Sequence, residues 1–381
     1  MSPPALRSSR RTQPLVRLGM GGQSKVPTAP SGLRACSERE VRVGVLLPLA
    51  DALASRGLPL AEMLVEVGAP HDLFADPENR VDDVTICRLF LIAAQRLSQP
   101  HLGLLVGRRR RLADLGAVGE LVSHCPTVGA GLRALISHLS LSDRVAAPML
   151  LDLGPQHLIL GYSFYHRIEV PIRPALDVAI SVAFAFLEQM CGPALRPLEV
   201  RFAYDEPDDL LPYREAFGCP VRFNAELSGV VFPADLLDLP LADADPGRRA
   251  VLEAQIREAR AHAGMSFAQQ VHAVLPQAIL GGRCTQAEVA QIFAMHERSL
   301  RRHLLAEGAH FHALLARARR ELATQLLADT RLGVAGIARA LGYADPNVFS
   351  RAFRAWTGTS PSAWRASLAD PAAAASDAVR P

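Results

Sequence analysis

The sequence predicts an α+β amino-terminal domain followed by an all-α carboxy-terminal domain, in which a long helix joins two helix-turn-helix units. Three observations support this fold class. One pattern of two short helices around a turn occurs twice between Cys284 and Arg365. A stretch of 19 residues without glycine or proline separates the copies. Upstream, helical and strand-like periodicities are mixed, and a chain of 381 residues is typical of two folded domains.

The first copy of the pattern has apolar residues at helical spacing. Val289, Ile292 and Phe293 lie on one stripe of its first helix. Leu300 and Leu304 lie on one stripe of its second helix. The two helices are therefore expected to share one small core, with their remaining residues facing outward.

The second copy starts 48 residues after the first, with residues 337–341 as its first helix and residues 349–353 in its second. Its turn is one residue longer. Gly342 supplies the backbone freedom that a sharp reversal needs. Asp345 is expected to cap the second helix by accepting backbone N–H groups, and Pro346 suits the first helical position.

Positive charge is concentrated in the same region. From Arg283 to Arg365 there are twelve arginines against six acidic residues, a net charge of +6, whereas the whole chain carries +3. Arginine is suited to bidentate contact with guanine edges and with phosphate. Lys25 is the only lysine of the chain, so arginine content alone is weak evidence. The position of the charge is stronger evidence, and it indicates a polyanion as partner.

The stretch between the copies, residues 311–329, is rich in alanine, leucine and arginine and is expected to be one continuous helix. Its 19 residues span about 28 Å at about 1.5 Å per residue. A rigid strut of this length can hold two recognition helices roughly one DNA turn, or about 34 Å, apart. One polypeptide would then meet the duplex as two subunits of a dimeric regulator do.

From about Met265 to Arg365 the chain resembles the DNA-binding domain of the AraC/XylS family of bacterial transcription regulators. The residues that carry the resemblance are Val289-Ala290, Leu300-Arg301-Arg302, Glu307-Gly308, Arg320-Glu321-Leu322-Ala323, Leu327-Ala328, Ile337-Ala338, Leu341-Gly342-Tyr343, Phe349-Ser350-Arg351-Ala352-Phe353, Trp356, Gly358, Ser360-Pro361 and Trp364-Arg365. Two such units at this spacing form a specific signature. Two positions depart from the family pattern: Ala294 stands where glycine is common, and His296 stands at the cap position where serine or threonine is.

The resemblance implies that the second helix of each unit faces the major groove. The DNA-binding set that it implies is Arg298, Arg301, Arg302, Pro346, Asn347, Ser350, Arg351 and Arg354. Asn347 suits adenine, and the arginines suit guanine. For Arg302 and Arg351, which occupy equivalent places, an ion pair with acidic neighbours is the alternative. The aromatic residues of this region are expected in the core: Phe349, Phe353, Trp356 and Trp364.

The amino-terminal region mixes two periodicities, which predicts an α+β domain. Helices are expected at residues 49–55, 82–97, 128–139 and 175–190. Strands are expected at residues 149–153, 157–164, 198–204 and 229–232, with Gly154-Pro155 as the hairpin turn between the first two.

This region resembles the arabinose-binding-like effector domain that accompanies one branch of the same family. The matching residues are Leu115-Gly116, Pro126-Thr127-Val128-Gly129, Leu132, Arg201-Phe202, Pro212-Tyr213 and Phe217-Gly218-Cys219-Pro220-Val221-Arg222-Phe223. The resemblance implies a domain that senses a small molecule and helps the protein to dimerise. It names no effector and no pocket residues.

The predicted organisation has five parts: a disordered tail over residues 1–40, an effector-sensing and dimerisation domain over 41–245, a linker helix over 246–263, the DNA-binding domain over 264–370 and a disordered tail over 371–381. The charged linker helix either couples the domains and contacts a second subunit, or is a solvated connector. No secretory signal and no run of about 18 apolar residues is present, which predicts a cytoplasmic protein without membrane contact.

No catalytic chemistry is predicted. The six cysteines, at positions 36, 87, 125, 191, 219 and 284, show no metal-binding spacing, and free thiols are expected. His310 and His312 flank a helix start and are expected at the surface rather than at a metal. No nucleophile elbow or phosphate-binding loop occurs, so no catalytic residue, cofactor or metal is expected.

The favoured hypothesis is a sequence-specific transcription regulator controlled by a small-molecule effector. Its expected partners are double-stranded promoter DNA, the effector, RNA polymerase and a second copy of the chain. The alternative is an enzyme whose amino-terminal domain converts a small molecule while the carboxy-terminal module targets DNA. The first hypothesis is favoured because the catalytic residues of an enzyme are expected to form a recognisable motif in the sequence, and none is found.

Overall fold

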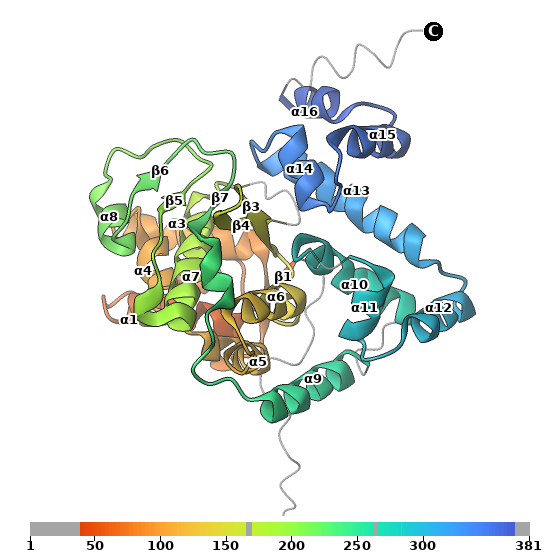
Figure 1. The fold of residues 1–381 in the computed structure, drawn as a ribbon. Coiled ribbons are helices and arrows are strands. Elements are labelled where there is room, and N and C mark those ends of the chain that lie inside the picture. Colours follow the sequence, from red (N-terminus) through yellow and green to blue (C-terminus); the bar gives the residue numbers. More distant parts are fainter. Residues whose placement is uncertain (1–38, 165–169, 262–265, 283, 370–381) are drawn as a thin grey trace, which may run out of the picture.

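The computed structural model describes residues 39–164, 170–261, 266–282 and 284–369. An α+β part and an all-helical part lie side by side (Figure 1). Residues 1–38 of the predicted tail over 1–40, the predicted tail over 371–381 and the predicted domain junction near residue 264 lie outside the described residues. The last two residues of the first tail differ from the prediction, because Arg39 pairs with Asp83 and Glu40 begins a strand.

The amino-terminal part is built on a five-stranded sheet with the strand order β3-β4-β7-β5-β6. Its strands are β3 (Ala146–Asp152), β4 (His157–Phe164), β5 (Glu199–Arg201), β6 (Val221–Arg222) and β7 (Ser228–Pro233). β3 and β4 form the antiparallel hairpin that the sequence predicts, in a register that pairs Met149 with Gly161. β5 and β6 pair in parallel. A separate pair, β1 (Glu40–Arg42) and β2 (Arg80–Asp82), is antiparallel.

Eight α-helices surround this sheet in the described part of the domain. They are α1 (Leu47–Ala54), α2 (Leu60–Glu66), α3 (Asp83–Arg96), α4 (Leu102–Arg108), α5 (Ala117–Ser123), α6 (Val128–His138), α7 (Arg173–Cys191) and α8 (Leu211–Phe217). α7 is the central helix and contacts α3, α4, β4 and β7. Within the described residues, the segment Arg173–Ala194 is the one helical stretch long and apolar enough to cross a membrane, and 56% of its apolar 18-residue window is buried in this core.

The carboxy-terminal part consists of helices. They are α9 (Pro246–Ala261), α10 (Phe267–Leu280), α11 (Gln286–Ile292), α12 (Glu297–Ala306), α13 (Phe311–Asp329), α14 (Val334–Ala340), α15 (Pro346–Thr357) and α16 (Pro361–Ala369). α11 with α12 and α14 with α15 form the two helix-turn-helix units, and α13 runs between them (Figure 1). The predicted bounds of α13 are confirmed at both ends. The predicted aromatic core is confirmed: Phe349 and Phe353 are fully buried, and Trp356 and Trp364 pack against the same cluster.

One hydrophobic core is shared by the sheet and the helical part. Met149 and Ile159 on the sheet belong to the same buried cluster as Val274 and Ala278 of α10. α10 also contacts α6, so the first helix of the carboxy-terminal part rests on two elements of the amino-terminal domain. This contact could not be predicted from the sequence, because the residues on both sides are ordinary core residues.

Two arginines add polar contacts between the parts. Arg331 donates from its backbone N–H to the carbonyl of Glu226 (2.9 Å) and from its guanidinium to Asn224 (3.0 Å), and it lies 3.4 Å from Asp205. Arg339 on α14 donates to the backbone carbonyl of Asp152 (2.8 Å).

Candidate nucleic-acid interface

The second helices of both units are held by cap contacts at their first turns. Asp345 accepts a hydrogen bond from the backbone N–H of Asn347 (2.8 Å), which confirms the predicted cap of α15. His296 caps α12 through Nδ1, which accepts from the backbone N–H of Arg298 (3.2 Å). Both caps orient the first turn of the helix that the family resemblance predicts to face the major groove.

Sequence reasoning missed the capping boxes at the starts of α10 and α11; the one at α11 belongs to the first helix-turn-helix unit. Thr285 accepts from the backbone N–H of Glu288 (3.2 Å), while Glu288 accepts from the backbone N–H of Thr285 (3.0 Å). The signal is present in the sequence as threonine followed three residues later by glutamate, directly before an apolar stripe.

The turns of the two units have the same left-handed backbone at equivalent positions. Ala294 has φ +48° and Gly342 has φ +74°. The position where the chain departs from the family's usual glycine is therefore one where the backbone conformation favours glycine. The first unit keeps the turn geometry in spite of this departure.

Glu307 and Gly308, two residues of the family pattern, tie the first unit to α10. The carboxylate of Glu307 accepts from the backbone N–H groups of Phe267 (2.8 Å) and Ala268 (2.7 Å) at the start of α10. These backbone hydrogen bonds lower the pKa of Glu307. Gly308 has φ +69° and ends α12. This pair therefore joins the end of one helix to the start of another.

The predicted DNA-binding side chains of α12 lie opposite its buried stripe. Arg298, Arg301 and Arg302 are exposed, whereas Leu300 and Leu304 are buried. Within the described residues, these arginines form no ion pair, so the acidic-neighbour alternative for Arg302 finds no partner there.

α15 is arranged in the same way around Phe349 and Phe353. Asn347, Arg351 and Arg354 are exposed. Arg351 and Arg354 also lack an ion-pair partner among the residues that the structure describes.

The remaining two residues of the predicted set, Pro346 and Ser350, are half-buried on the first turns of α15. The Ser350 hydroxyl donates to the carbonyl of Pro346 (2.9 Å), which leaves its oxygen as an acceptor on the helix surface.

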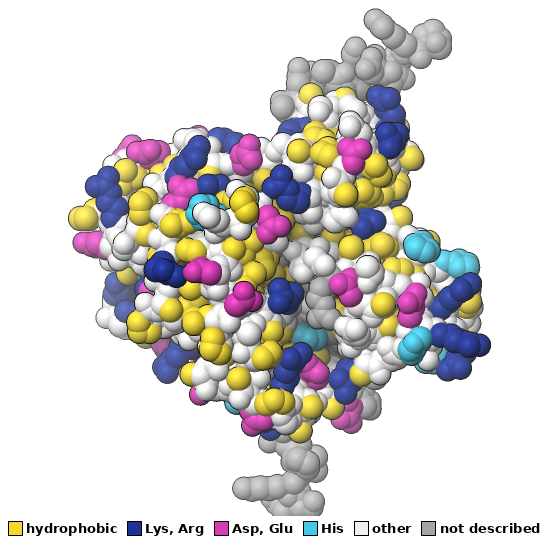
Figure 2. All heavy atoms as spheres, viewed as in Figure 1, with side chains coloured by type: hydrophobic (Ala, Val, Ile, Leu, Met, Phe, Trp, Pro, Cys, Tyr) yellow, Lys and Arg dark blue, Asp and Glu magenta, His cyan; other side chains and the backbone are white. Residues whose placement is uncertain are grey.

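Basic side chains gather at two places on the edge of the molecule that is turned away from the amino-terminal domain. One group lies over α12, and the other lies near α15 (Figure 2). Between these two helices runs α13, on which Arg320 is a further exposed arginine without an ion pair in the described chain. The geometry therefore offers two separate cationic surfaces that are joined by one helix.

Other arginines of the region have structural roles. Arg319 lies over the ring of Tyr343, 4.7 Å from its centroid, and donates to the carbonyl of Leu341 (3.1 Å). Arg365 donates to the carbonyl of Leu327 (3.0 Å). The net charge of +6 in the sequence therefore overstates the charge that is free for a polyanion.

Other chemistry has little support in the described residues. No group of three or more metal-ligating side chains occurs within them. The five cysteines that the structure describes are free thiols, and Cys87, Cys125 and Cys191 are buried. Burial raises the pKa of Cys87 to about 12 and that of Cys191 to about 11, which makes these thiols inert as nucleophiles.

Two helix-turn-helix units with unpaired arginines on both second helices define a DNA-binding regulator. Comparison with known families agrees: a model described as the arabinose-binding domain of AraC transcription regulator, N-term, matches residues 57–241, and a model described as helix-turn-helix domain matches residues 289–367. The chain belongs to the AraC family of transcription regulators and combines a ligand-binding amino-terminal domain with a DNA-binding carboxy-terminal domain.

Relatives along most of the chain are transcription regulators. The chain is 27% identical over 281 residues to the HTH-type transcriptional regulator VirS of Mycobacterium tuberculosis, covering 73% of this chain and 82% of that protein. It is 28% identical over 324 residues to the ornithine utilization regulator of Pseudomonas aeruginosa, covering 83% and 94%. The solved structure of the regulator CdpR from Pseudomonas aeruginosa aligns with 24% identity and a TM-score of 0.41, covering 81% of this chain and 96% of that one. None of these comparisons supports the enzyme alternative.

Proposed function

We propose that one subunit places both α12 and α15 on the same promoter duplex. The observation that supports this is the pair of exposed, unpaired arginine groups on these helices, at opposite ends of α13 and on the same edge of the molecule (Figure 2). α13 has 19 residues and a length of about 28 Å, close to the roughly 34 Å of one DNA turn.

The proposed contacts follow from the chemistry of the exposed side chains. Arg298, Arg301 and Arg302 on α12 donate to guanine edges or phosphates of one major-groove segment. On α15, Asn347 reads an adenine, and Arg351 and Arg354 contact guanine or phosphate in the next segment.

Pro346 and Ser350 belong to the same α15 surface. Their half-buried position at the first turns suits van der Waals contact and one accepted hydrogen bond rather than charge neutralisation.

The partners proposed beyond DNA are an effector held by the amino-terminal domain, RNA polymerase and a second copy of the chain, all in the cytoplasm. We assign residues 41–245 to effector sensing and dimerisation, 246–263 to the linker helix and 264–370 to DNA binding. A coupling role of the linker helix is supported by Arg248, which lies 2.5 Å from Glu120 of α5. No catalytic role is proposed for any residue.

The test uses the full chain and a duplex selected from a random pool by that chain. Arg301→Ala and Arg351→Ala are each expected to weaken binding by about 1–3 kcal/mol if the side chain reads a base, or to reduce the salt slope by about 1 if it contacts phosphate. Arg214→Ala is the matched control, since Arg214 is an exposed arginine on α8 in the other domain. The proposal fails if both variants bind the selected duplex as tightly as the control at every salt concentration.

A further inference from the structure

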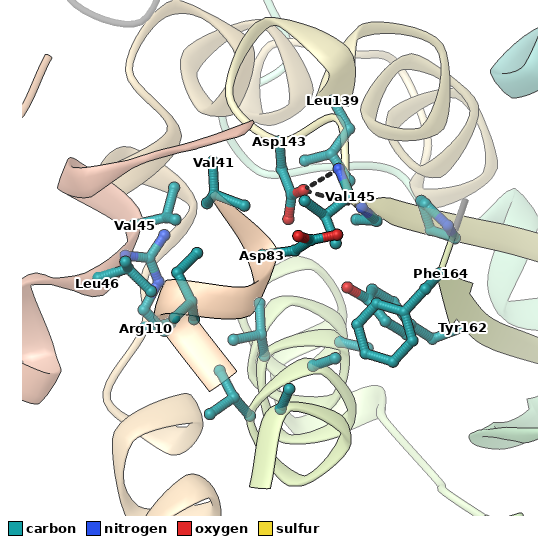
Figure 3. A pocket seen from close by; sticks show the side chains of 18 of the residues that line it. Val41, Val45, Leu46, Asp83, Arg110, Leu139, Asp143, Val145, Tyr162 and Phe164 are labelled. Carbon is teal, nitrogen blue, oxygen red and sulfur yellow. Dashed lines mark hydrogen bonds between the residues drawn. The ribbon is translucent and has the colours of Figure 1, made fainter. Parts of the chain in front are cut away.

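A cavity of about 150 Å³ lies inside the amino-terminal domain, between the hairpin β3–β4 and the helices α3 and α7 (Figure 3). Its lining is almost entirely hydrophobic and includes Phe90, Leu160, Val178 and Phe186. An apolar cavity of roughly this size is large enough for a benzene ring. The cavity can therefore hold one small hydrophobic ligand.

Three charged side chains also line this cavity: Asp83, Arg110 and Asp143. Two of them already have charged partners. Arg39 donates to both carboxylate oxygens of Asp83 (3.0 and 3.1 Å). Arg110 lies 3.7 Å from Asp114, and its guanidinium donates to a backbone carbonyl (3.1 Å).

Asp143 has only one of its two oxygens engaged. Oδ1 accepts from the backbone N–H groups of Val145 (2.8 Å) and Ala146 (2.9 Å), whereas no described residue donates to Oδ2. Burial raises the pKa of this carboxyl to about 6, although the two backbone hydrogen bonds and the positive charge of Arg110 lower it. Asp143 is half-buried, and Oδ2 remains available as an acceptor for a ligand that brings a donor. A hydrogen bond to an ionised carboxylate is stronger than one between neutral groups.

Building on the proposed function, we propose that this cavity is the effector site and that its ligand is a small hydrophobic amine. The hydrocarbon body occupies the apolar lining, and the ammonium group donates to Oδ2 of Asp143. An acidic ligand fits less well, because its carboxylate would stand near the carboxylates of Asp83 and Asp143. Among the described residues that line the cavity, Arg110 is the one cation. Tighter binding of an acidic ligand would indicate that Arg110, and not Asp143, contacts the ligand.

The wall of the cavity is also the surface on which α10 rests. Side chains alternate across β3 and β4, so that Pro148 and Tyr162 line the cavity while Met149 and Ile159 belong to the core shared with α10. The hairpin is thus one sheet layer between the ligand and the helix that supports the first helix-turn-helix unit. A ligand that displaces β3 and β4 also changes the position of α10. This is a direct physical route from the effector to the DNA-binding helices.

Binding is measured on the full chain by calorimetry with three probes of the same size: benzylamine, benzyl alcohol and benzoate. Benzylamine is expected to bind about tenfold or more tightly than benzoate, since a hydrogen bond to a charged group is stronger than one between neutral groups. Asp143→Asn should remove most of this preference. Asp208→Asn, at an exposed carboxylate outside the cavity, is the control. Tighter binding of benzoate, or unchanged benzylamine affinity in Asp143→Asn, would overturn the assignment.

A second variant tests the cavity itself. Ala179 lies on α7 and faces the void, so Ala179→Leu fills space without displacing a packed side chain. It should fold and lose binding of benzylamine. Unchanged affinity would exclude this cavity as the site.

The same preparations are assayed on the selected duplex, which separates this inference from the proposed function. Saturating benzylamine is expected to change the DNA dissociation constant by about fivefold or more. If the chain binds the duplex but no amine, this inference fails and the proposed function stands. If it binds benzylamine in the cavity but no duplex, the proposed function fails and the site stands. If the amine binds without changing the DNA affinity, the proposed transmission from the cavity through β3 and β4 to α10 is wrong.

Discussion

Replacing Ala294 by glycine is expected to stabilise the first helix-turn-helix unit. Ala294 has φ +48°, and a left-handed backbone costs an L-residue about 1–2 kcal/mol. Glycine removes this strain but loses about 0.5–1 kcal/mol through its greater freedom in the unfolded chain. The side chain of Ala294 is exposed, so little burial is lost. The net expectation is a gain of about 0.5–1 kcal/mol in the free energy of unfolding.

The reverse change at the equivalent position of the second unit is the matched control. Gly342 has φ +74°, and a Cβ added there would lie 3.2 Å from Sγ of Cys284. Gly342→Ala therefore combines the left-handed strain with a tight contact and is expected to cost about 1–2 kcal/mol.

Tryptophan fluorescence during urea unfolding measures the stability of the helical part in both variants. The chain has two tryptophans, Trp356 and Trp364, and both pack on the core of the helical part. Their signal should shift to higher urea in Ala294→Gly and to lower urea in Gly342→Ala, with an unchanged slope m. Destabilisation by Ala294→Gly, or no effect of Gly342→Ala, would refute the view that both turns need the same backbone.

Three further changes test other parts of the structure. Asn347→Ala should relax the choice of base at one adenine by about 1–3 kcal/mol, measured by competition between duplexes that differ at that base pair; an unchanged preference would remove Asn347 from base reading. Asp177→Asn should flatten the pH dependence of stability. Burial raises the pKa of Asp177 to about 7, against hydrogen bonds from Tyr204 and Tyr213, so the folded state keeps a proton that the unfolded state releases above about pH 4. Stability is therefore full below about pH 4 and falls as the pH rises through about 7, and a variant with the same slope as the wild-type chain in urea titrations would contradict this. Ala318→Pro, at a fully buried position inside α13, should lower the free energy of unfolding by about 3 kcal/mol or more, and a tryptophan transition at the wild-type urea concentration would argue against a continuous strut.

Long elements with a clear period could be predicted from the sequence. The bounds of β4 and α13 are the predicted ones, because alternation in one and an uninterrupted run of helix-forming residues in the other fill the whole element. The predicted strand at residues 198–204 is shorter, since only Glu199–Arg201 pairs within the sheet. α2, α4, α5 and α8 were missed, because a single seven-residue helix makes too few turns to show a period. α11 and α14 are equally short, but their pattern occurs twice in the sequence.

The surface of the DNA-binding helices was predictable for a similar reason. Arginines opposite a buried stripe have to be exposed, as Arg302 and Arg351 are. The roles of Arg331 and Arg339 were not predictable, since their partners lie more than a hundred residues away in the other domain. The cavity could not be predicted either, because its lining comes from segments between Val41 and Phe186 whose sequence is typical of an ordinary core.

Hydroxyl-radical footprinting of the full chain on its selected duplex tests the central claim most directly. The account predicts two protected segments about one helical turn, or roughly 10 base pairs, apart on one face of the DNA. Arg301→Ala should weaken protection of one segment, and Arg351→Ala that of the other. A single protected segment, or loss of the same segment in both variants, would contradict the reading of one duplex by two helices of one subunit.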